Sequence, residues 1–254
     1  MQIKILGWAG GIGANLRTTS FLIDDDVLVD AGTGLGDVPL NNMTGIRHIF
    51  LTHSHMDHVV GLPLLADSMF GVHDEPIIVH ALEETIQALK THIFNWVIWP
   101  DFSELPTRDN PSINFKAMKP GEKVTIRSRE FEMIRVNHTV PGVGYCVSTR
   151  NRTVVFSGDT TTNDNLWDVL NGYDHIDMMF VESAFSNSEL EISKVAKHYC
   201  PSLLGEDIKK LRHRPDVWLT HFKPGEEDLI YRECVEAMPD FNVKRLNGGE
   251  IFKL

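Results

Sequence analysis

The sequence has few cysteines and no long apolar run. Its three cysteines, Cys146, Cys200 and Cys234, are widely spaced in 254 residues, which predicts free thiols in a reducing compartment rather than a disulfide framework. No stretch approaches the roughly 18 consecutive apolar residues of a membrane span. The first residues are too short and too alternating to form a signal peptide. We therefore expect a cytoplasmic protein with no membrane partner.

Basic side chains are also in the minority. The chain has 24 lysines and arginines against 35 acidic residues, a formal net charge of −11. A dedicated nucleic-acid binder needs a basic face to displace counterions, so no stable nucleic-acid complex is expected. The hydrophobic content of 42% is sufficient for an ordinary core. Because no linker or low-complexity segment interrupts the chain, we predict a single domain spanning residues 1–254.

Potential metal ligands concentrate in one short segment, His53-Ser54-His55-Met56-Asp57-His58. The preceding run, Ile46–Leu51, is apolar enough for a buried strand, and the following run, Val59–Met69, has near-helical apolar spacing. Ligands are commonly placed where a strand ends and a helix begins in α/β sheets. Imidazole and carboxylate groups suit zinc, manganese or iron. Surface histidines are the alternative interpretation, but four potential ligands in six residues favour a metal site.

This motif resembles the signature of the metallo-β-lactamase superfamily, which requires further ligands along the chain. His138, Asp159 and His221 each follow a predicted strand in the required order. The resemblance implies two divalent metal ions, with zinc favoured and manganese or iron as alternatives. It assigns one ion to His53, His55 and His138. It assigns the second to Asp57, His58 and His221, with Asp159 as the bridge.

Such a pair of ions can activate a hydroxide near neutral pH and neutralise charge on a phosphate. Asp57 is the expected orienting group and proton acceptor for that nucleophile. Neutral imidazole ligands leave net positive charge at the site, which suits an anionic substrate. The sequence therefore predicts a metal-dependent hydrolase of an anionic ester.

The order of predicted elements fits the superfamily fold. A strand, a hairpin and a strand–helix segment open the chain, and a second run of strands ends in ligand-bearing turns. We predict an αβ/βα sandwich of two stacked mixed β-sheets flanked by helices. The expected strands are residues 3–6, 18–23, 27–30, 46–51, 76–80, 113–118, 123–126, 131–136, 144–149, 153–157, 178–182 and 216–220. The expected helices are residues 59–69, 82–90, 166–170, 190–197, 202–211 and 226–236.

Glu182 and His198 resemble the proton-donating pair of the phosphodiesterase branch of the superfamily. By that resemblance, Glu182 orients and charges His198, and His198 is the general acid for the leaving oxygen. The alternative is that His198 merely ends a helix. One departure from the tRNA-processing endonucleases of this branch is Tyr199-Cys200-Pro201, because those enzymes place Ser or Thr after the histidine.

Over nearly its whole length the chain looks most similar to bacterial class II type 3′,5′-cyclic-nucleotide phosphodiesterases. The similar segments are residues 16–22, 92–102, 136–141, 197–201 and 220–225. The resemblance implies hydrolysis of cyclic AMP or cyclic GMP to the 5′-nucleotide. The alternatives are a tRNase Z-like endoribonuclease, a cyclic-dinucleotide phosphodiesterase and a non-catalytic metal-binding sensor. The endoribonuclease lacks support because no Gly/Pro/Lys-rich tRNA-gripping arm is present. A sensor is disfavoured because metal binding alone needs no general acid.

An unusual aromatic segment spans His92–Phe102. It is either a buried helix or oligomer contact, or an aromatic wall on which a planar base can stack. Trp96 and Trp99, together with Thr139, are the candidate substrate contacts, and we expect a homodimer. The glycine-rich loop Gly7–Gly13 lacks the spacing of a nucleotide-binding fingerprint, so its glycines are expected to permit close backbone approach.

Overall fold

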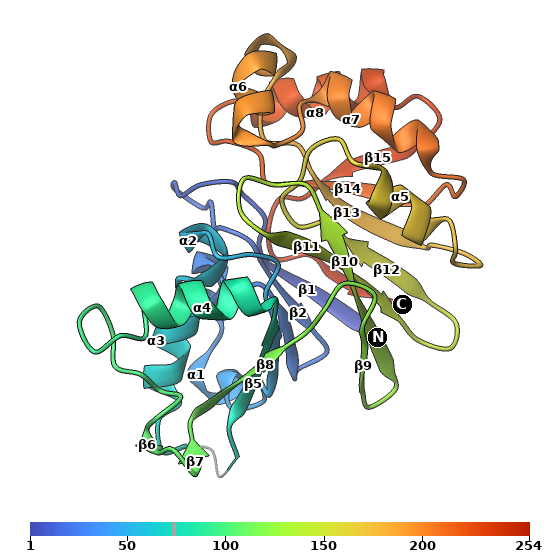
Figure 1. Cartoon of the computed structure of the whole chain (residues 1–254). Helices are drawn as coiled ribbons and strands as arrows, with labels where there is room; N and C mark the ends of the chain where they lie inside the picture. Colours follow the sequence, from blue (N-terminus) through green and yellow to red (C-terminus); the bar gives the residue numbers. More distant parts are fainter. Residues whose placement is uncertain (73–74) are drawn as a thin grey trace. The chain divides into compact units, whose positions relative to one another are not determined.

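The computed structural model describes residues 1–72 and 75–254. These residues form two compact units that interleave in sequence (Figure 1). Unit 1 comprises Met1–Trp8, Ala14–Met118 and Gly248–Leu254, and unit 2 comprises Ala9–Gly13 and Lys119–Asn247. Each unit contains one mixed seven-stranded sheet with its own helices, which confirms the predicted combination of two mixed sheets and flanking helices. The assignment of residues 1–254 to one domain stays a prediction.

The sheet of unit 1 has the strand order β16-β1-β2-β3-β4-β5-β8. Pairing is antiparallel from β16 to β3 and parallel from β3 to β8. The inner parallel strands β3, β4 and β5 are mostly apolar and buried, whereas the edge strand β8 carries exposed Asn114 and Lys116. The strands are β1 (Gln2–Gly7), β2 (Ser20–Ile23), β3 (Val27–Val29), β4 (His48–Phe50), β5 (Ile77–Ala81), β8 (Ile113–Ala117) and β16 (Ile251–Lys253).

Helices α3 (Gly61–Ser68) and α4 (Glu83–His92) make the crossovers between the parallel strands of unit 1. They bury residues at helical spacing, such as Leu62 and Leu65 in α3, in the apolar core of this unit. The other elements of unit 1 are the 3-10 helix η1 (Thr33–Asp37), α1 (Leu40–Met43), α2 (Met56–Val59) and the ribbon β6 (Pro106–Thr107) with β7 (Asn110–Pro111).

The helix predicted over residues 59–69 is split between α2 and α3. The Gly61 amide donates to the Ala31 carbonyl at 2.7 Å, and the Ala31 amide donates to the His58 carbonyl at 2.8 Å. These bonds tie the segment to the end of β3 rather than to the preceding helical turn. A Cβ at Gly61 would lie 2.8 Å from the Ala31 carbonyl oxygen, so the close approach requires glycine.

The sheet of unit 2 has the order β15-β14-β13-β12-β11-β10-β9, antiparallel from β9 to β12 and parallel from β12 to β15. The strands are β9 (Lys123–Ile126), β10 (Arg129–Val136), β11 (Gly142–Ser148), β12 (Thr153–Phe156), β13 (Met178–Glu182), β14 (Asp216–Thr220) and β15 (Asn242–Arg245). The helices are α5 (Asp164–Leu170), η2 (Asn187–Glu189), α6 (Leu190–Ala196), α7 (Pro201–Asp207), η3 (Ile208–Lys210) and α8 (Glu227–Ala237).

Residues beyond the predicted elements complete both sheets. Several elements are additional to the sequence prediction: the C-terminal strands β15 and β16, the helices α1 and η1, and the β6–β7 ribbon. The three cysteines are free and buried, as expected. Among the residues that the structure describes, no helix is both long enough and apolar enough to cross a membrane.

Candidate metal centre

In unit 1, four candidate ligands follow β4, as the sequence predicts. His53 and His55 lie on the extended segment after the strand, and Asp57 and His58 lie in the one-turn helix α2. The ring of His53 is 4.6 Å from that of His55 and 4.2 Å from that of His58, measured between centroids. We call these four residues the first ligand cluster. Their imidazoles converge because the strand end and the helical turn are adjacent in sequence.

Asp30, at the end of β3, fixes the orientation of His58. Its Oδ2 lies 2.7 Å from His58 Nδ1, and both atoms are buried. The Thr52 amide and hydroxyl also donate to this carboxylate, at 2.8 Å each. Burial raises the pKa of Asp30, and the His58 imidazole and the Thr52 donors oppose that rise without cancelling it. Because Nδ1 is engaged, Nε2 of His58 is the atom left to face a metal ion.

Asp30 was assigned no role from the sequence. It adopts a left-handed backbone conformation with φ of 58°, which is strained for a residue other than glycine. An acidic residue that ends an otherwise apolar strand, Val27-Leu28-Val29-Asp30, was the available signal. Strained residues held in place by their surroundings often lie at functional sites.

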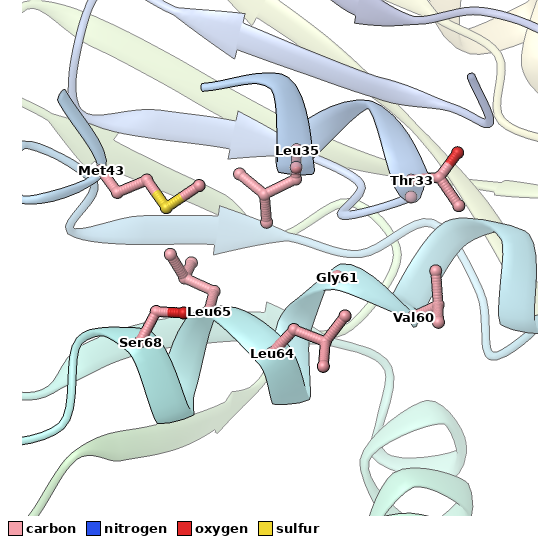
Figure 2. Close-up of a pocket in the computed structure, with 10 residues that line it drawn as sticks. Thr33, Leu35, Met43, Val60, Gly61, Leu64, Leu65 and Ser68 are labelled. Carbon is pink, nitrogen blue, oxygen red and sulfur yellow. The ribbon is translucent and has the colours of Figure 1, made fainter. Parts of the chain in front are cut away.

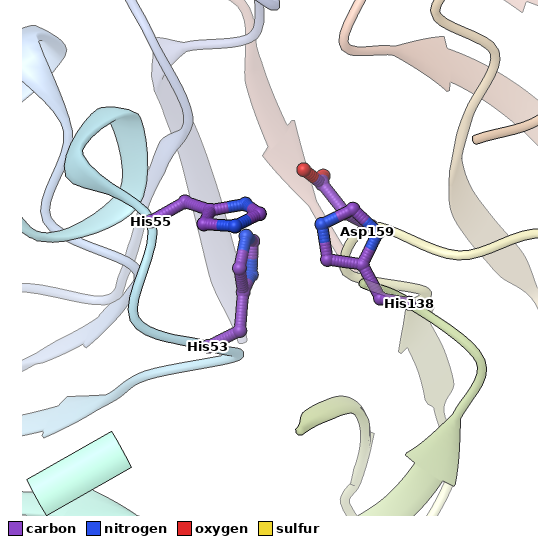
Figure 3. A group of neighbouring side chains, drawn as sticks. All are labelled: His53, His55, His138 and Asp159. Atoms are coloured by element: carbon purple, nitrogen blue, oxygen red, sulfur yellow. The ribbon is translucent and has the colours of Figure 1, made fainter. Parts of the chain in front are cut away.

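In unit 2, three candidate ligands occupy turns after three different strands. His138 follows β10, Asp159 follows β12 and His221 follows β14, as predicted. We call them the second ligand cluster. His221 Nδ1 lies 3.3 Å from Asp159 Oδ1, and all three residues are buried. Figure 3 shows four candidate ligands: His53 and His55 after β4, and His138 and Asp159 after β10 and β12.

A backbone carbonyl group orients His138 of the second cluster much as Asp30 orients His58 of the first. His138 Nδ1 lies 3.0 Å from the carbonyl oxygen of Lys197, and the Lys197 ammonium group donates back to the His138 carbonyl at 3.2 Å. Lys197 caps α6 in a left-handed conformation with φ of 52°. Because this hydrogen bond engages Nδ1, Nε2 of His138 is the nitrogen that could bind a metal ion.

Glu182 and His198 form a buried hydrogen-bonded pair in unit 2. Glu182 Oε1 lies 2.8 Å from His198 Nδ1, and it also accepts from the Thr160 amide at 3.0 Å. Burial alone would lower the pKa of His198, but the charge of Glu182 and its hydrogen bond outweigh burial and raise it. The His198 ring lies 4.9 Å from that of His138 and 5.0 Å from that of His221. The Glu182–His198 pair therefore lies beside two candidate ligands.

The glycine-rich loop contacts the His221 turn, as its composition predicts. The Gly10 amide donates to the Phe222 carbonyl at 2.9 Å. A Cβ at Gly10 would lie 2.4 Å from the His221 carbonyl oxygen, so only glycine fits. Lys223 donates to the Gly10 carbonyl at 2.9 Å, and His221 itself has φ of 63°. The loop thus packs against a ligand turn whose backbone conformation is strained.

The aromatic segment is a tight loop after α4 and does not continue the helix. Phe94 and Phe102 are buried in the core of unit 1. Trp99 packs against that core and donates from Nε1 to the Pro63 carbonyl at 3.0 Å. Trp96 is 58% exposed, with φ of 64°. Thr139 is exposed on the β10–β11 connection of unit 2. The roles of Trp96, Trp99 and Thr139 in substrate binding stay predictions.

The donor chemistry of both clusters fits a divalent metal ion. The seven candidate ligands are five histidines and two aspartates. Nitrogen and oxygen donors of this kind bind zinc, manganese and iron. Metal-binding histidines almost always engage their second ring nitrogen with a carboxylate or carbonyl, and His58 and His138 both do so.

Comparison with known proteins gives the class. The sequence pattern of the β-lactamase superfamily domain matches residues 26–245, and the chain therefore belongs to the metallo-β-lactamase superfamily. The metallo-β-lactamase fold protein YhfI from Bacillus subtilis has the same fold, with a TM-score of 0.78 at 18% identity over 99% of this chain and 98% of that one.

The names of two relatives state different activities. A probable 3′,5′-cyclic-nucleotide phosphodiesterase of Yersinia pestis is 24% identical over 204 residues, covering 71% of this chain and 58% of the relative. A ribonuclease Z of Clostridium beijerinckii is 29% identical over 157 residues, covering 58% of this chain and 48% of the relative. The chain thus spans about half the length of these relatives. Both are distant, so similarity alone does not choose between the two activities.

Proposed function

We propose that the protein is a metal-dependent phosphodiesterase that hydrolyses 3′,5′-cyclic nucleotides, cyclic AMP or cyclic GMP, to 5′-nucleotides. The observation that carries the proposal is the buried Glu182–His198 pair beside His138 and His221. A site that only binds metal needs no proton donor, whereas cleavage of an alkyl phosphodiester requires a proton on the leaving oxygen.

The two ligand clusters are proposed to act together on two divalent ions. One ion would be held by His53, His55, His138 and Asp159, and the other by Asp57, His58, Asp159 and His221. When bound, such ions lower the pKa of water and neutralise charge on the phosphate. Zinc is the favoured metal. Manganese and iron are alternatives, because all three metals accept imidazole and carboxylate ligands.

The remaining steps belong to side chains of the protein. Asp57 is 30% exposed at its side chain, which allows its carboxylate to orient the attacking water and accept a proton. Glu182 engages Nδ1 of His198, so the transferable proton is carried on Nε2. As the bond from phosphorus to the ribose 3′-oxygen breaks, His198 gives this proton to the oxygen. Water supplies the hydroxyl that remains on phosphorus, and the product is the 5′-nucleotide.

A cyclic nucleotide is favoured over tRNA on charge. The net charge of −11 opposes the counterion displacement on which tRNA affinity depends. The name of the Yersinia pestis relative supports a cyclic nucleotide, but the match to ribonuclease Z keeps endonuclease activity as the second candidate. The homodimer expected from the sequence also stays part of the proposal, and light scattering during gel filtration would test it.

The deciding experiment is turnover of a substrate panel by protein of measured metal content. The panel comprises cyclic AMP, cyclic GMP, a cyclic dinucleotide and a precursor tRNA. We expect the largest kcat/KM for a cyclic mononucleotide, and a loss of that activity in His198→Ala with unchanged metal content. Preferred cleavage of precursor tRNA would instead establish the endonuclease, and full metal loading without any turnover would establish a binding protein.

A further inference from the structure

Unit 1 contains a cavity of about 340 Å³ between η1, α1 and α3. Its volume lies within the range of small-molecule pockets, roughly 300–1,000 Å³. Figure 2 shows Leu35 facing Leu64 and Leu65 across it, with Met43 towards one end and Thr33 towards the other. The lining residues are Gly32, Thr33, Leu35, Gly36, Met43, Val60, Gly61, Leu64, Leu65 and Ser68.

The lining is uncharged. None of the ten described residues around the cavity is acidic or basic, and most of their side chains are aliphatic. The Thr33 hydroxyl is engaged by the Thr18 amide at 2.8 Å, and in Figure 2 its oxygen points away from Leu35 and Leu65. A phosphate ester would lose its hydration here without a compensating donor. This cavity is therefore unsuited to the nucleotide of the proposed reaction.

The cavity has an apolar floor and an open mouth. Leu35, Gly61 and Leu65 are buried, whereas Gly36, Leu64 and Ser68 are exposed. The Ser68 hydroxyl is the polar side-chain group on the exposed side. Met43, whose unbranched thioether adapts to irregular shapes, completes the wall. A molecule with a hydrocarbon tail and one uncharged polar end matches this division.

Gly36 lines the exposed side of the cavity, at a position with no structural need for glycine. A Cβ at Gly36 would have no neighbouring atom within 4 Å, and its backbone does not require glycine. Gly61 is different, because its Cβ would lie 2.8 Å from the Ala31 carbonyl oxygen. A larger side chain at Gly36 would therefore be accommodated at an exposed position that lines the cavity.

From this geometry we propose that the cavity binds a small uncharged amphiphile, with its alkyl chain on Leu35 and Leu65 and its polar end at Ser68. The proposal is independent of the phosphodiesterase reaction. The floor is continuous with the segment that carries the first ligand cluster, because Gly61 bonds to Ala31 and Ala31 bonds to His58. The proposed site is therefore connected to the metal-ligand segment through these two backbone hydrogen bonds.

Methyl NMR of methionine tests the proposal without any activity assay. We would titrate protein carrying ¹³C-methyl methionine with straight-chain 1-alkanols from butanol to decanol, assigning Met43 by Met43→Leu. The Met43 signal should shift, whereas the buried Met178 and Met179 of unit 2 should not. Affinity should increase about fourfold per added methylene until the cavity is full, which corresponds to about 0.8 kcal/mol per buried methylene.

Two variants that fill the mouth make the test specific. Gly36→Phe and Ser68→Phe place a ring at exposed positions, so folding should survive, which unchanged Met178 and Met179 signals would verify. Both variants should weaken octanol binding at least tenfold. The matched control, Val195→Phe on exposed α6 of unit 2, should bind octanol as the parent protein does. An unmoved Met43 signal up to the solubility limit of octanol, or equal binding by both variants and the control, would overturn the proposal.

Discussion

A buried carboxylate–imidazole pair in unit 1 and another in unit 2 have nearly the same geometry. Asp30 meets His58 at 2.7 Å in unit 1, and Glu182 meets His198 at 2.8 Å in unit 2. In both, Nδ1 contacts the carboxylate and Nε2 is left to act. The similarity shows that hydrogen-bond geometry alone does not assign a role.

The surroundings of the two pairs differ. His58 belongs to the first ligand cluster, with its ring 4.2 Å from that of His53. His198 belongs to neither candidate ligand group but lies between the rings of His138 and His221. We therefore propose metal binding for the first imidazole and proton donation for the second. Substitutions at the two pairs should separate these roles, because one controls metal occupancy and the other controls protonation of the leaving group.

The largest effect is expected at Asp159, because this residue is proposed to bind both ions. Asp159→Ala should lower turnover of cyclic AMP by about 1,000-fold or more, since several kcal/mol of charge stabilisation depend on the ions. The metal content measured by elemental analysis should fall from about two ions per chain in the parent to one or none. Retention of two ions, or of activity within tenfold of the parent, would remove the bridging role of Asp159.

The next largest effect on turnover is expected at His198, the proposed proton donor. His198→Ala should lower turnover of cyclic AMP by about 100-fold with metal content unchanged, and Glu182→Gln should do the same more weakly. The loss should be much smaller for bis(p-nitrophenyl) phosphate, because p-nitrophenolate leaves without a proton. Exposed His175→Ala is the matched control and should change neither rate. An equal loss on both substrates would indicate a structural role for His198.

Breaking the pair in unit 1 should have a different signature. Asp30→Asn should weaken metal binding about 10- to 100-fold, because the carboxylate orients His58 and increases its basicity. Turnover should recover when excess metal is supplied, whereas turnover of Glu182→Gln should not. Metal titration monitored by activity measures both. If added metal fails to restore Asp30→Asn, the two pairs are not functionally distinct in this way.

The aromatic loop of unit 1 offers a smaller effect on substrate affinity. Trp96→Ala should raise KM for cyclic AMP about ten- to a hundredfold, since stacking on one base contributes about 1–3 kcal/mol. Hydrolysis of a base-free phosphodiester should change little, and Val97→Ala on the same exposed turn is the control. Trp99→Ala should instead lower stability, because Trp99 packs on the core. Unchanged KM in Trp96→Ala would contradict base stacking.

Another buried carboxylate, Asp207 of unit 2, is paired with lysine and should affect stability alone. Burial would raise the pKa of Asp207, but hydrogen bonds from Lys210, Tyr199 and Trp167 outweigh it and lower the pKa below 3.8. Its stabilisation is therefore complete above this value and is lost as pH falls through the folded-state pKa.

Asp207→Asn should cost about 1.5–3 kcal/mol of unfolding free energy at pH 7, the range for hydrogen bonds to a charged group. The deficit should shrink in urea unfolding as pH falls below about 4. Asp164→Asn, which removes an exposed partner of the same lysine, is the control and should cost little. A deficit independent of pH would show that packing, not charge, stabilises the network.

Local patterns in the sequence predicted much of the fold. Apolar alternation located the strands of both sheets, and helical spacing located α4, α5 and α8. Strands β15 and β16 were missed because each is short and partly exposed, and pairing with a distant strand is what defines it. The break between α2 and α3 was missed because it depends on hydrogen bonds from Gly61 and Ala31 to other segments.

The first ligand cluster was predictable because its four residues lie within six positions at the end of one strand. The elements that carry Glu182 and His221 were predictable for a similar reason, since each residue ends or follows an apolar strand. Residue type and local spacing thus determined the candidate donors, their order and the metals that suit them.

Only the tertiary structure decided which groups orient those donors. Asp30 reaches His58 across 28 positions, and the Lys197 carbonyl reaches His138 across 59. Only the fold separated Trp99, anchored to Pro63, from exposed Trp96 within one aromatic run. The physical reason is that strand order and helix placement depend on long-range burial and pairing, whereas the chemistry of a side chain is already present in its sequence.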